Sequence, residues 1–319
     1  MNTKRWKSIT AVIVDPFGRD QLAATKAAAI AARCGARLTL LNTFMLPQPT
    51  PEALLGSAKQ NIAAAIRQRR KQLEQLAARL ARRGLVVRCA VEWDYPIHEA
   101  IVRYVLKHKP DLLVAESHRR SRIARWVLAN TDWELIRSCP CPLWFVRSAS
   151  LPAKPRVLVA VDPRHTNEKP AGLDERLLAA ASSLTSQLKG EIDVAHAYRS
   201  PPGANPGLLR APLRRPLPSQ QTRKFIDRTA RQVERVAARY DVSADRCFVK
   251  EGEATDVLTA LTGQRRTDVL TMGAVSRTFL TRPVIGNTAE RVIDQVGCDV
   301  FVIKPARFKT PVLRAKPQL

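Results

Sequence analysis

The sequence predicts an α/β protein that consists of two tandem doubly wound domains, each a five-stranded parallel sheet flanked by helices. The chain has 319 residues, about twice the usual size of a domain. Two motifs of the first half recur in the second: VIVDP at 12–16 returns as VAVDP at 159–163, and NT at 130–131 returns at 287–288. Short Val/Leu/Ile runs alternate with helix-like segments throughout, as in βαβ units.

The repeat is long enough to be a whole copied domain. Asn287 follows Asn130 by 157 residues, whereas Asp162 follows Asp15 by 147, so the second copy carries about ten extra residues between these points. Solenoid and propeller repeats are shorter, roughly 20 to 50 residues. Each half is therefore expected to bury a core of its own.

Five apolar runs of the first half are expected to be strands, at 9–14, 38–42, 85–91, 112–115 and 143–146. Turn residues bound the helices between them. Asp20 is expected to cap a helix that ends at Gly35, and an Ala/Arg/Gln-rich helix is expected to end at Gly84. A third helix begins at Ile97 and ends before Pro110.

The second half repeats this pattern. Strands are expected at 157–161, 192–197, 247–250, 269–272 and 300–303, and helices at 174–189, 220–239, 255–264 and 287–295. Six prolines between 199 and 219 argue against a regular element in that segment. The domains predicted are 1–148 and 156–306, joined by a linker at 149–155 and followed by a basic tail at 307–319. The two domains are expected to pack against each other.

Composition indicates an ordinary globular chain with one unusual feature, its charge. The 53 basic and 28 acidic residues give a net charge of +25, which permits a weak anionic partner such as nucleic acid or lipid headgroups without requiring one. Six cysteines without C-x-x-C spacing indicate reduced thiols, and we expect a cytoplasmic protein. No apolar run approaches the roughly 18 residues of a membrane span. The histidines show no metal-ligand spacing, so no metal is expected.

Small and polar residues follow the first and fourth strands of the second half, where open parallel sheets bind ligands. Asp162 follows the first strand and Gly273 the fourth, while Gly286, Asn287 and Thr288 open the last helix. Glycines admit a phosphate close to the backbone, and a helix start favours negative charge. An ordinary βα turn with a helix cap explains the same residues without a ligand.

The segment 268–305, DVLTMGAVSRTFLTRPVIGNTAERVIDQVGCDVFVIKP, resembles the C-terminal signature of the universal stress protein family. Nucleotide-binding members of that family carry glycine, two residues, glycine, nine residues, glycine and then Ser or Thr. VAVDP also matches the opening strand of the family. The resemblance covers nearly the whole chain and is greatest to the tandem-domain E branch.

This resemblance implies roles for individual residues of the second half, with ATP or another nucleotide as the ligand. It implies that Asp162 contacts adenine or ribose, that the Ala197 backbone contacts the base, and that the phosphates are held by Gly273, Gly286, Asn287 and Thr288. The sequence departs from the pattern at two of these places. Ser276 replaces the second glycine, where its hydroxyl could still donate to an oxygen, and Asn287 stands where Ser or Thr is expected.

The first half departs further from the same pattern. Glu116, Arg119 and Ala129 align with Gly273, Ser276 and Gly286. A carboxylate repels phosphate and the side chains block the backbone, so no ATP is expected to bind there.

The predicted function is therefore binding of a small phosphate-containing ligand by the second domain, without turnover and with no catalytic residue. The resemblance implies a role in stress endurance, including tolerance of DNA damage. Two alternatives stay open. One is slow ATP hydrolysis in the second domain. The other is an adaptor that binds nucleic acid or another anionic partner through the Arg-rich helices, with Arg119, Arg120, Arg122 and Arg125 nearby.

Overall fold

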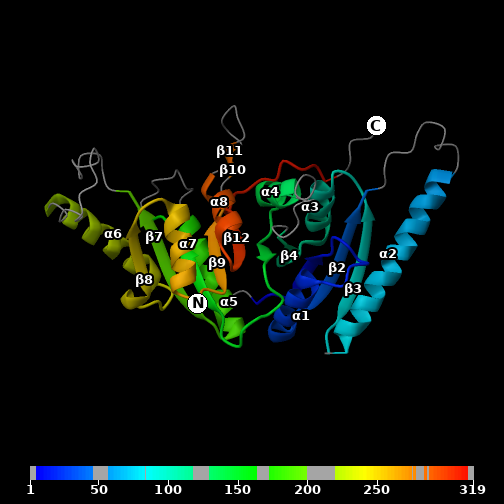
Figure 1. The fold of residues 1–319 in the computed structure, drawn as a ribbon, viewed down its shortest axis with the longest axis horizontal. Coiled ribbons are helices and arrows are strands. Elements are labelled where there is room, and N and C mark those ends of the chain that lie inside the picture. The colour runs from blue at the N-terminus through cyan, green and yellow to red at the C-terminus, as the bar shows by residue number, and fades with distance from the viewer. Residues whose placement is uncertain are drawn as a thin grey trace.

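The strands of both halves lie in one sheet, which has helices on both faces (Figure 1). The structure is a computed structural model that describes residues 5–45, 57–82, 84–117, 129–163, 172–199, 220–274, 276–277, 284–285 and 287–314.

The first half contributes five parallel strands, β1 (Ser8–Val12), β2 (Arg37–Phe44), β3 (Val87–Trp93), β4 (Leu112–Glu116) and β5 (Leu143–Val146). Their order across the sheet is β3-β2-β1-β4-β5, so it reverses between β1 and β4. The central strands are runs of Val, Leu, Ile and Ala because helices cover both of their faces.

The second half contributes β6 (Arg156–Ala160), β7 (Glu191–Tyr198), β8 (Cys247–Glu251), β9 (Val269–Gly273) and β12 (Asp299–Ile303). These strands are also parallel, in the order β12-β9-β6-β7-β8, with the reversal between β6 and β9. The sequence predicted all ten strands, and their bounds are confirmed to within two residues at each end.

The two halves meet at one edge of each domain. β5 pairs with β12 in antiparallel register, with Trp144 opposite Phe301. The sequence predicted two domains that pack against each other, but it did not predict that they share a sheet. Without this pairing each strand would leave a row of backbone N–H and C=O groups exposed at an edge. The pairing of β5 with β12 therefore satisfies the backbone groups of both edge strands and joins the two halves into one continuous sheet.

The helices divide between the two faces by which core they join. One face carries α1 (Leu22–Cys34), α2 (Ser57–Ala81), α5 (Leu173–Leu188) and α6 (Gln220–Ala238). The other carries α3 (Ile97–His108), α4 (Ala129–Ser138), α7 (Ala254–Gln264) and α8 (Asn287–Gln295). Each core extends across both halves. No helix among the described ranges is long and apolar enough to cross a membrane.

Two local features differ from the sequence prediction. The residue before α1 is Gln21 and not Asp20, and its Nε2 donates to the carbonyls of Asp15 and Gly18 at 2.8 and 2.9 Å. A short antiparallel hairpin, β10 (Ser276–Arg277) with β11 (Val284–Ile285), precedes α8 and was not predicted. Gly35 does end α1 as expected, because its φ of 63° is the left-handed conformation that glycine adopts without strain.

Each half also binds the last helix of the other half. The Arg147 guanidinium, just after β5, donates to the Ile293 carbonyl in α8. The Lys304 ammonium, just after β12, donates to the Ile136 carbonyl in α4. Lys304 follows Arg147 by 157 positions, and Ile293 follows Ile136 by the same number. The two contacts are therefore equivalent. Cations are favourable near the C-terminal ends of helices, where carbonyls are unpaired.

A buried ion pair lies at the same junction, and it has no counterpart in the other half. Lys26 of α1 lies 2.6 Å from the carboxylate of Asp299, and both side chains are buried. Asp299 also accepts from Trp144 Nε1 at 2.9 Å and from the Arg147 N–H at 2.7 Å. The equivalent residue of the first half is Pro142, 157 positions earlier, which carries no charge. The carboxylate at the join thus comes from the second half alone.

Candidate functional site

The carboxyl ends of β6 and β9 form the place where strand order reverses in the second half. In the first half the corresponding ends belong to β1 and β4. Ligands of open α/β sheets bind outside such a reversal, because the helices leave the two neighbouring strands on opposite faces. Asp162 and Gly273, predicted from the sequence, follow or end these two strands, so the topology brings them to one place.

Two side chains show which residues of the halves are equivalent at these ends. In the first half, Asn42 Nδ2 donates to the Ile13 carbonyl at 2.7 Å. In the second, His196 Nδ1 lies 2.9 Å from the Val161 carbonyl, and because a carbonyl only accepts, this nitrogen carries the proton. Asn42 and His196 occupy the sixth position of β2 and β7, respectively. Val161 is therefore the equivalent of Ile13.

The sequence alignment of Asp15 with Asp162 is wrong by one residue. Asp162 follows Val161 directly, so its equivalent in the first half is Val14. A shift by one residue reverses the direction of a side chain on an extended chain. The side chains differ accordingly, since Asp162 is 4% exposed whereas Asp15 lies on the surface and accepts from the Phe17 N–H at 2.9 Å. The first half thus places an apolar residue where the second places a buried carboxylate.

A second carboxylate lies against Asp162, and sequence reasoning missed it. The Asp162 N–H donates to both carboxylate oxygens of Asp174, at 3.0 Å each. Asp174 is the second residue of α5 and is 5% exposed. The sequence showed it only as the start of a helix, and the buried contact depends on how α5 begins over β6. Two buried carboxylates favour hydroxyl or amino donors of a ligand over its phosphates at this position.

Gly273 has a packing role that the sequence did not reveal. A Cβ atom at this position would come 2.7 Å from Leu173 Cδ2 and 3.3 Å from its Cγ. Leu173, the first residue of α5, is fully buried. A side chain at position 273 would therefore require the Leu173 side chain to move, whatever else binds there. In the first half Glu116 takes the equivalent place, opposite Val146 as Gly273 is opposite Ile303.

The other predicted residues lie around the same end of the second half. Ala197 is half-buried near the end of β7, where it pairs with Lys250. Asn287 and Thr288 are the first two residues of α8, and Ser276 begins β10. The structure describes only the backbone of these three residues, and Gly286 lies outside the described residues. Within the described ranges no group of three or more His, Cys, Asp or Glu side chains could hold a metal ion.

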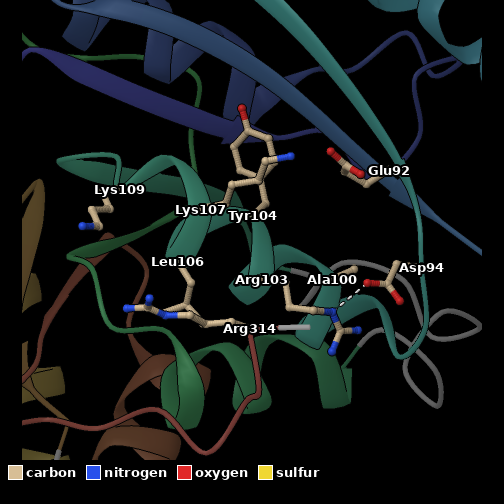
Figure 2. Close-up of a pocket in the computed structure, with 9 residues that line it drawn as sticks. All are labelled: Glu92, Asp94, Ala100, Arg103, Tyr104, Leu106, Lys107, Lys109 and Arg314. Atoms are coloured by element: carbon tan, nitrogen blue, oxygen red, sulfur yellow. Dashed lines mark hydrogen bonds and ion pairs between the residues drawn. The ribbon is translucent and has the colours of Figure 1, made fainter. Parts of the chain in front are cut away.

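A separate hollow of about 480 Å³ lies in the first half, beside α3 (Figure 2). Arg103 lines it and is neutralised there, since its Nε lies 2.7 Å from Asp94 and its Nη1 lies 2.8 Å from Glu99. Figure 2 shows Arg314 on the C-terminal segment beside Leu106, so the segment after β12 returns to the first half. The hollow is lined by four cations, Arg103, Lys107, Lys109 and Arg314, and by two carboxylates, Glu92 and Asp94, so its positive charge is neutralised only in part.

The Arg-rich helices present their arginines to solvent where the structure describes them. Arg67, Arg70 and Arg79 of α2 are exposed, and so are Arg223, Arg228, Arg231 and Arg235 of α6. The four arginines at 119, 120, 122 and 125 lie outside the described residues. Solvated arginines on a helix are equally typical of an ordinary surface and of an anion-binding surface.

A family model described as the universal stress protein family matches residues 10–147 and again 155–304. Universal stress protein E of Photorhabdus laumondii is 27% identical over 315 residues, which cover 96% of this chain and 97% of that protein. Universal stress protein E of Escherichia coli K12 is 26% identical over 312 residues, which cover 94% and 95%.

Among solved structures, a putative universal stress protein from Pseudomonas aeruginosa superposes with a TM-score of 0.69 at 23% identity, covering 94% of each chain. A universal stress protein from Archaeoglobus fulgidus superposes with a TM-score of 0.64 at 13% identity, covering 93% of this chain and 96% of that one. At these identities the superpositions support the fold, and the two matched ranges agree with the two halves of the sheet.

Proposed function

This chain belongs to the universal stress protein family, and we propose that its second half binds a nucleotide or a similar small phosphate-containing ligand without turning it over. One observation carries the proposal. The reversal of strand order in the second half combines a buried carboxylate, Asp162, with the small residue Gly273, whereas the first half has Val14 and Glu116 in their places. The chain is similar to universal stress protein E over nearly its full length.

The ligand groups are assigned by the chemistry of each element. Buried carboxylates accept hydrogen bonds, so Asp162 and Asp174 suit the ribose hydroxyls or the amino group of a base. The start of α8 at Asn287 suits the phosphates, because the first N–H groups of a helix are unpaired and carry partial positive charge. Phosphates placed beside the two aspartates would be repelled.

Binding without turnover is proposed because the buried histidine of β7 is already engaged. His196 is 2% exposed and its Nδ1 donates to the Val161 carbonyl, so it is held in the core. A general base must reach the water or hydroxyl that it deprotonates. Slow hydrolysis of ATP is the competing proposal. Release of inorganic phosphate above the no-enzyme rate, lost in an Asp162→Asn variant, would favour it.

The first half is proposed to be a structural or partner-binding copy. Glu116 faces the approach that a phosphate would use, and Val14 offers no acceptor to a ribose. The adaptor alternative rests on the exposed arginines of α2 and α6 and the net charge of +25. A labelled oligonucleotide whose mobility shifts at low salt, and shifts less at moderate salt, would support it. We place the protein in the cytoplasm, with a role in stress endurance that includes tolerance of DNA damage.

Calorimetric titration of the full chain with ATP tests the ligand site. Asp162→Asn removes the acceptor charge with little change of shape and is expected to weaken binding about tenfold or more. Asp15→Asn is the matched control, because Asp15 is exposed and is not the equivalent residue. Equal affinity in wild type and Asp162→Asn, or an equal loss in both variants, would place the site elsewhere. Thermal unfolding of each variant shows whether it is folded.

A further inference from the structure

The first half contains a second hollow, of about 410 Å³, at the opposite end of the sheet from the proposed nucleotide site. It is lined by the beginnings of β1 and β2, by residues 88–92 of β3, by the end of α3 and by one residue of α2. Its cationic side chains are Arg37, Arg70, Arg88 and Lys107. Glu92 is the carboxylate among the lining residues, and it lies four residues beyond Arg88 on β3, about 13 Å along the strand.

At the equivalent place in the second half, the arginine has carboxylate partners. Cys89 pairs with Leu40 as Cys247 pairs with Val194, so Arg88 is the equivalent of Arg246. Arg246 is held by two carboxylates, since its Nε lies 2.7 Å from Asp193 and its Nη2 lies 3.0 Å from Glu191.

A further arginine of the second half uses the same carboxylate. Arg265 Nε lies 3.0 Å from Asp193, and its guanidinium lies over the Phe248 ring at 4.6 Å. Asp193 is 4% exposed. The charges of this end of the second half are therefore balanced internally, around one buried acid.

The first half lacks both balancing acids. β2 and β7 begin at Arg37 and Glu191, so Arg37 replaces Glu191 and Thr39 replaces Asp193. One substitution reverses a charge and the other removes one. In the part of the chain that the structure describes, none of Arg37, Arg70, Arg88 and Lys107 forms an ion pair within 4.0 Å. Hydroxyl groups of Thr10, Thr39 and Tyr104 also line the hollow, and those of Thr39 and Tyr104 are hydrogen-bonded to each other.

We propose that this hollow binds a small anion that carries two or more phosphate groups, in the place that Asp193 and Glu191 fill in the second half. Arginine guanidinium groups and hydroxyls are the donors that recognise phosphate oxygens. A volume of about 410 Å³ lies within the range of small-ligand sites. The site is separate from the proposed nucleotide site, which lies at the carboxyl ends of the strands.

Inorganic pyrophosphate is the probe, titrated into the full chain at low salt by calorimetry. Thr39→Asp restores the second-half arrangement by giving Arg88 an internal carboxylate, and we expect it to weaken pyrophosphate binding at least tenfold. Arg88→Gln is expected to weaken it similarly, by removing a charged donor. Arg79→Gln is the control, because Arg79 is exposed on α2, does not line the hollow, and its loss changes the net charge equally.

Two further arms separate this hollow from the general charge of the surface and from a surface that binds long polyanions. Asp15→Asn, an exposed change in the first half that does not line the hollow, should leave pyrophosphate affinity within twofold of wild type. A single-stranded 20-mer should bind no more tightly than pyrophosphate. The proposal is overturned by equal affinity in wild type, Thr39→Asp and Arg88→Gln, by an equal loss in Arg79→Gln, or by binding of the 20-mer alone. Thermal unfolding of each variant shows whether it is folded. If Thr39→Asp does not fold, the result with Arg88→Gln decides the test.

Discussion

The two halves of the chain have the same strand order and opposite charge arrangements at the two ends of the sheet. At the carboxyl ends, the second half places the buried Asp162 beside a glycine, whereas the first half has Val14 and Glu116. At the amino ends, the second half pairs Arg246 with internal acids, whereas the first half leaves Arg88 without them. Two copies of one domain can therefore keep the same core while the side chains at both ends of the sheet differ in charge.

The join between the halves combines equivalent contacts with one asymmetric ion pair. Arg147 and Lys304 make equivalent contacts across it, each to a carbonyl in the last helix of the other half. Trp144 and Phe301, which face each other on β5 and β12, have ring centroids 5.7 Å apart. Asp299 is the asymmetric element, because Pro142 stands at its equivalent position. Stability at the join is therefore expected to depend more on the second half than on the first.

The largest expected effect follows from removing that asymmetric carboxylate. Asp299→Ala leaves Lys26 charged in the core, and breaking one side of a buried ion pair costs about 3–5 kcal/mol. Urea unfolding of the full chain measures the loss. A Lys26→Met, Asp299→Leu double variant should recover much of it, since no buried charge is left unpaired. A loss below about 1 kcal/mol in Asp299→Ala would show that the pair does not stabilise the join.

Gly273→Ala is expected to cost about 1–3 kcal/mol, because the added Cβ would come 2.7 Å from a Leu173 methyl group. In a Leu173→Ala background the same change should cost much less, so the two variants should be strongly non-additive. Gly263→Ala is the control, since nothing lies within 4 Å of its Cβ position in α7. Additive losses at 173 and 273 would mean that this glycine is required by something other than Leu173.

Lys304 gives a smaller effect, which appears as a dependence on pH. Burial lowers the pKa of Lys304 from 10.5 to about 8, and the charge of Cys139 opposes this in part. Between these values the unfolded chain binds more protons than the folded chain, so the contribution of Lys304 to stability rises with pH. The difference in unfolding free energy between wild type and Lys304→Met should grow by about 1 kcal/mol from pH 8 to pH 9. A constant difference would show that the pKa of Lys304 is not lowered.

Most of the fold was predictable because it depends on local pattern. Runs such as LLVA at 112–115 and LWFV at 143–146 are buried on both faces, and they are strands as their composition indicates. The antiparallel pairing of β5 with β12 was not predictable, because either strand could equally have ended a separate sheet. It depends on which edges meet, which no local pattern encodes.

The sequence predicted which strand ends form the candidate site, but not all of the side chains that meet there. Asp162 and Gly273 were found because they follow strands, and the topology does bring those strand ends together. Asp174 was missed because its contact requires knowing where α5 begins in space. The error at Asp15 arose because the DP motif follows the first strand in both halves. In the first half the motif begins two residues after Ile13, whereas in the second it begins one residue after the equivalent Val161. Matching the DP motif pairs Asp15 with Asp162, whereas the hydrogen bonds of Asn42 and His196 pair Ile13 with Val161.

The central claim is that nucleotide binds at the carboxyl ends of the second half and not of the first. Hydrogen exchange of the full chain, measured with and without saturating ATP, tests it most directly. Protection is expected for amides around Asp162 and at the start of α8, with no change around Val14 and Glu116. Protection around Val14 and Glu116, or none at either end, would contradict the claim.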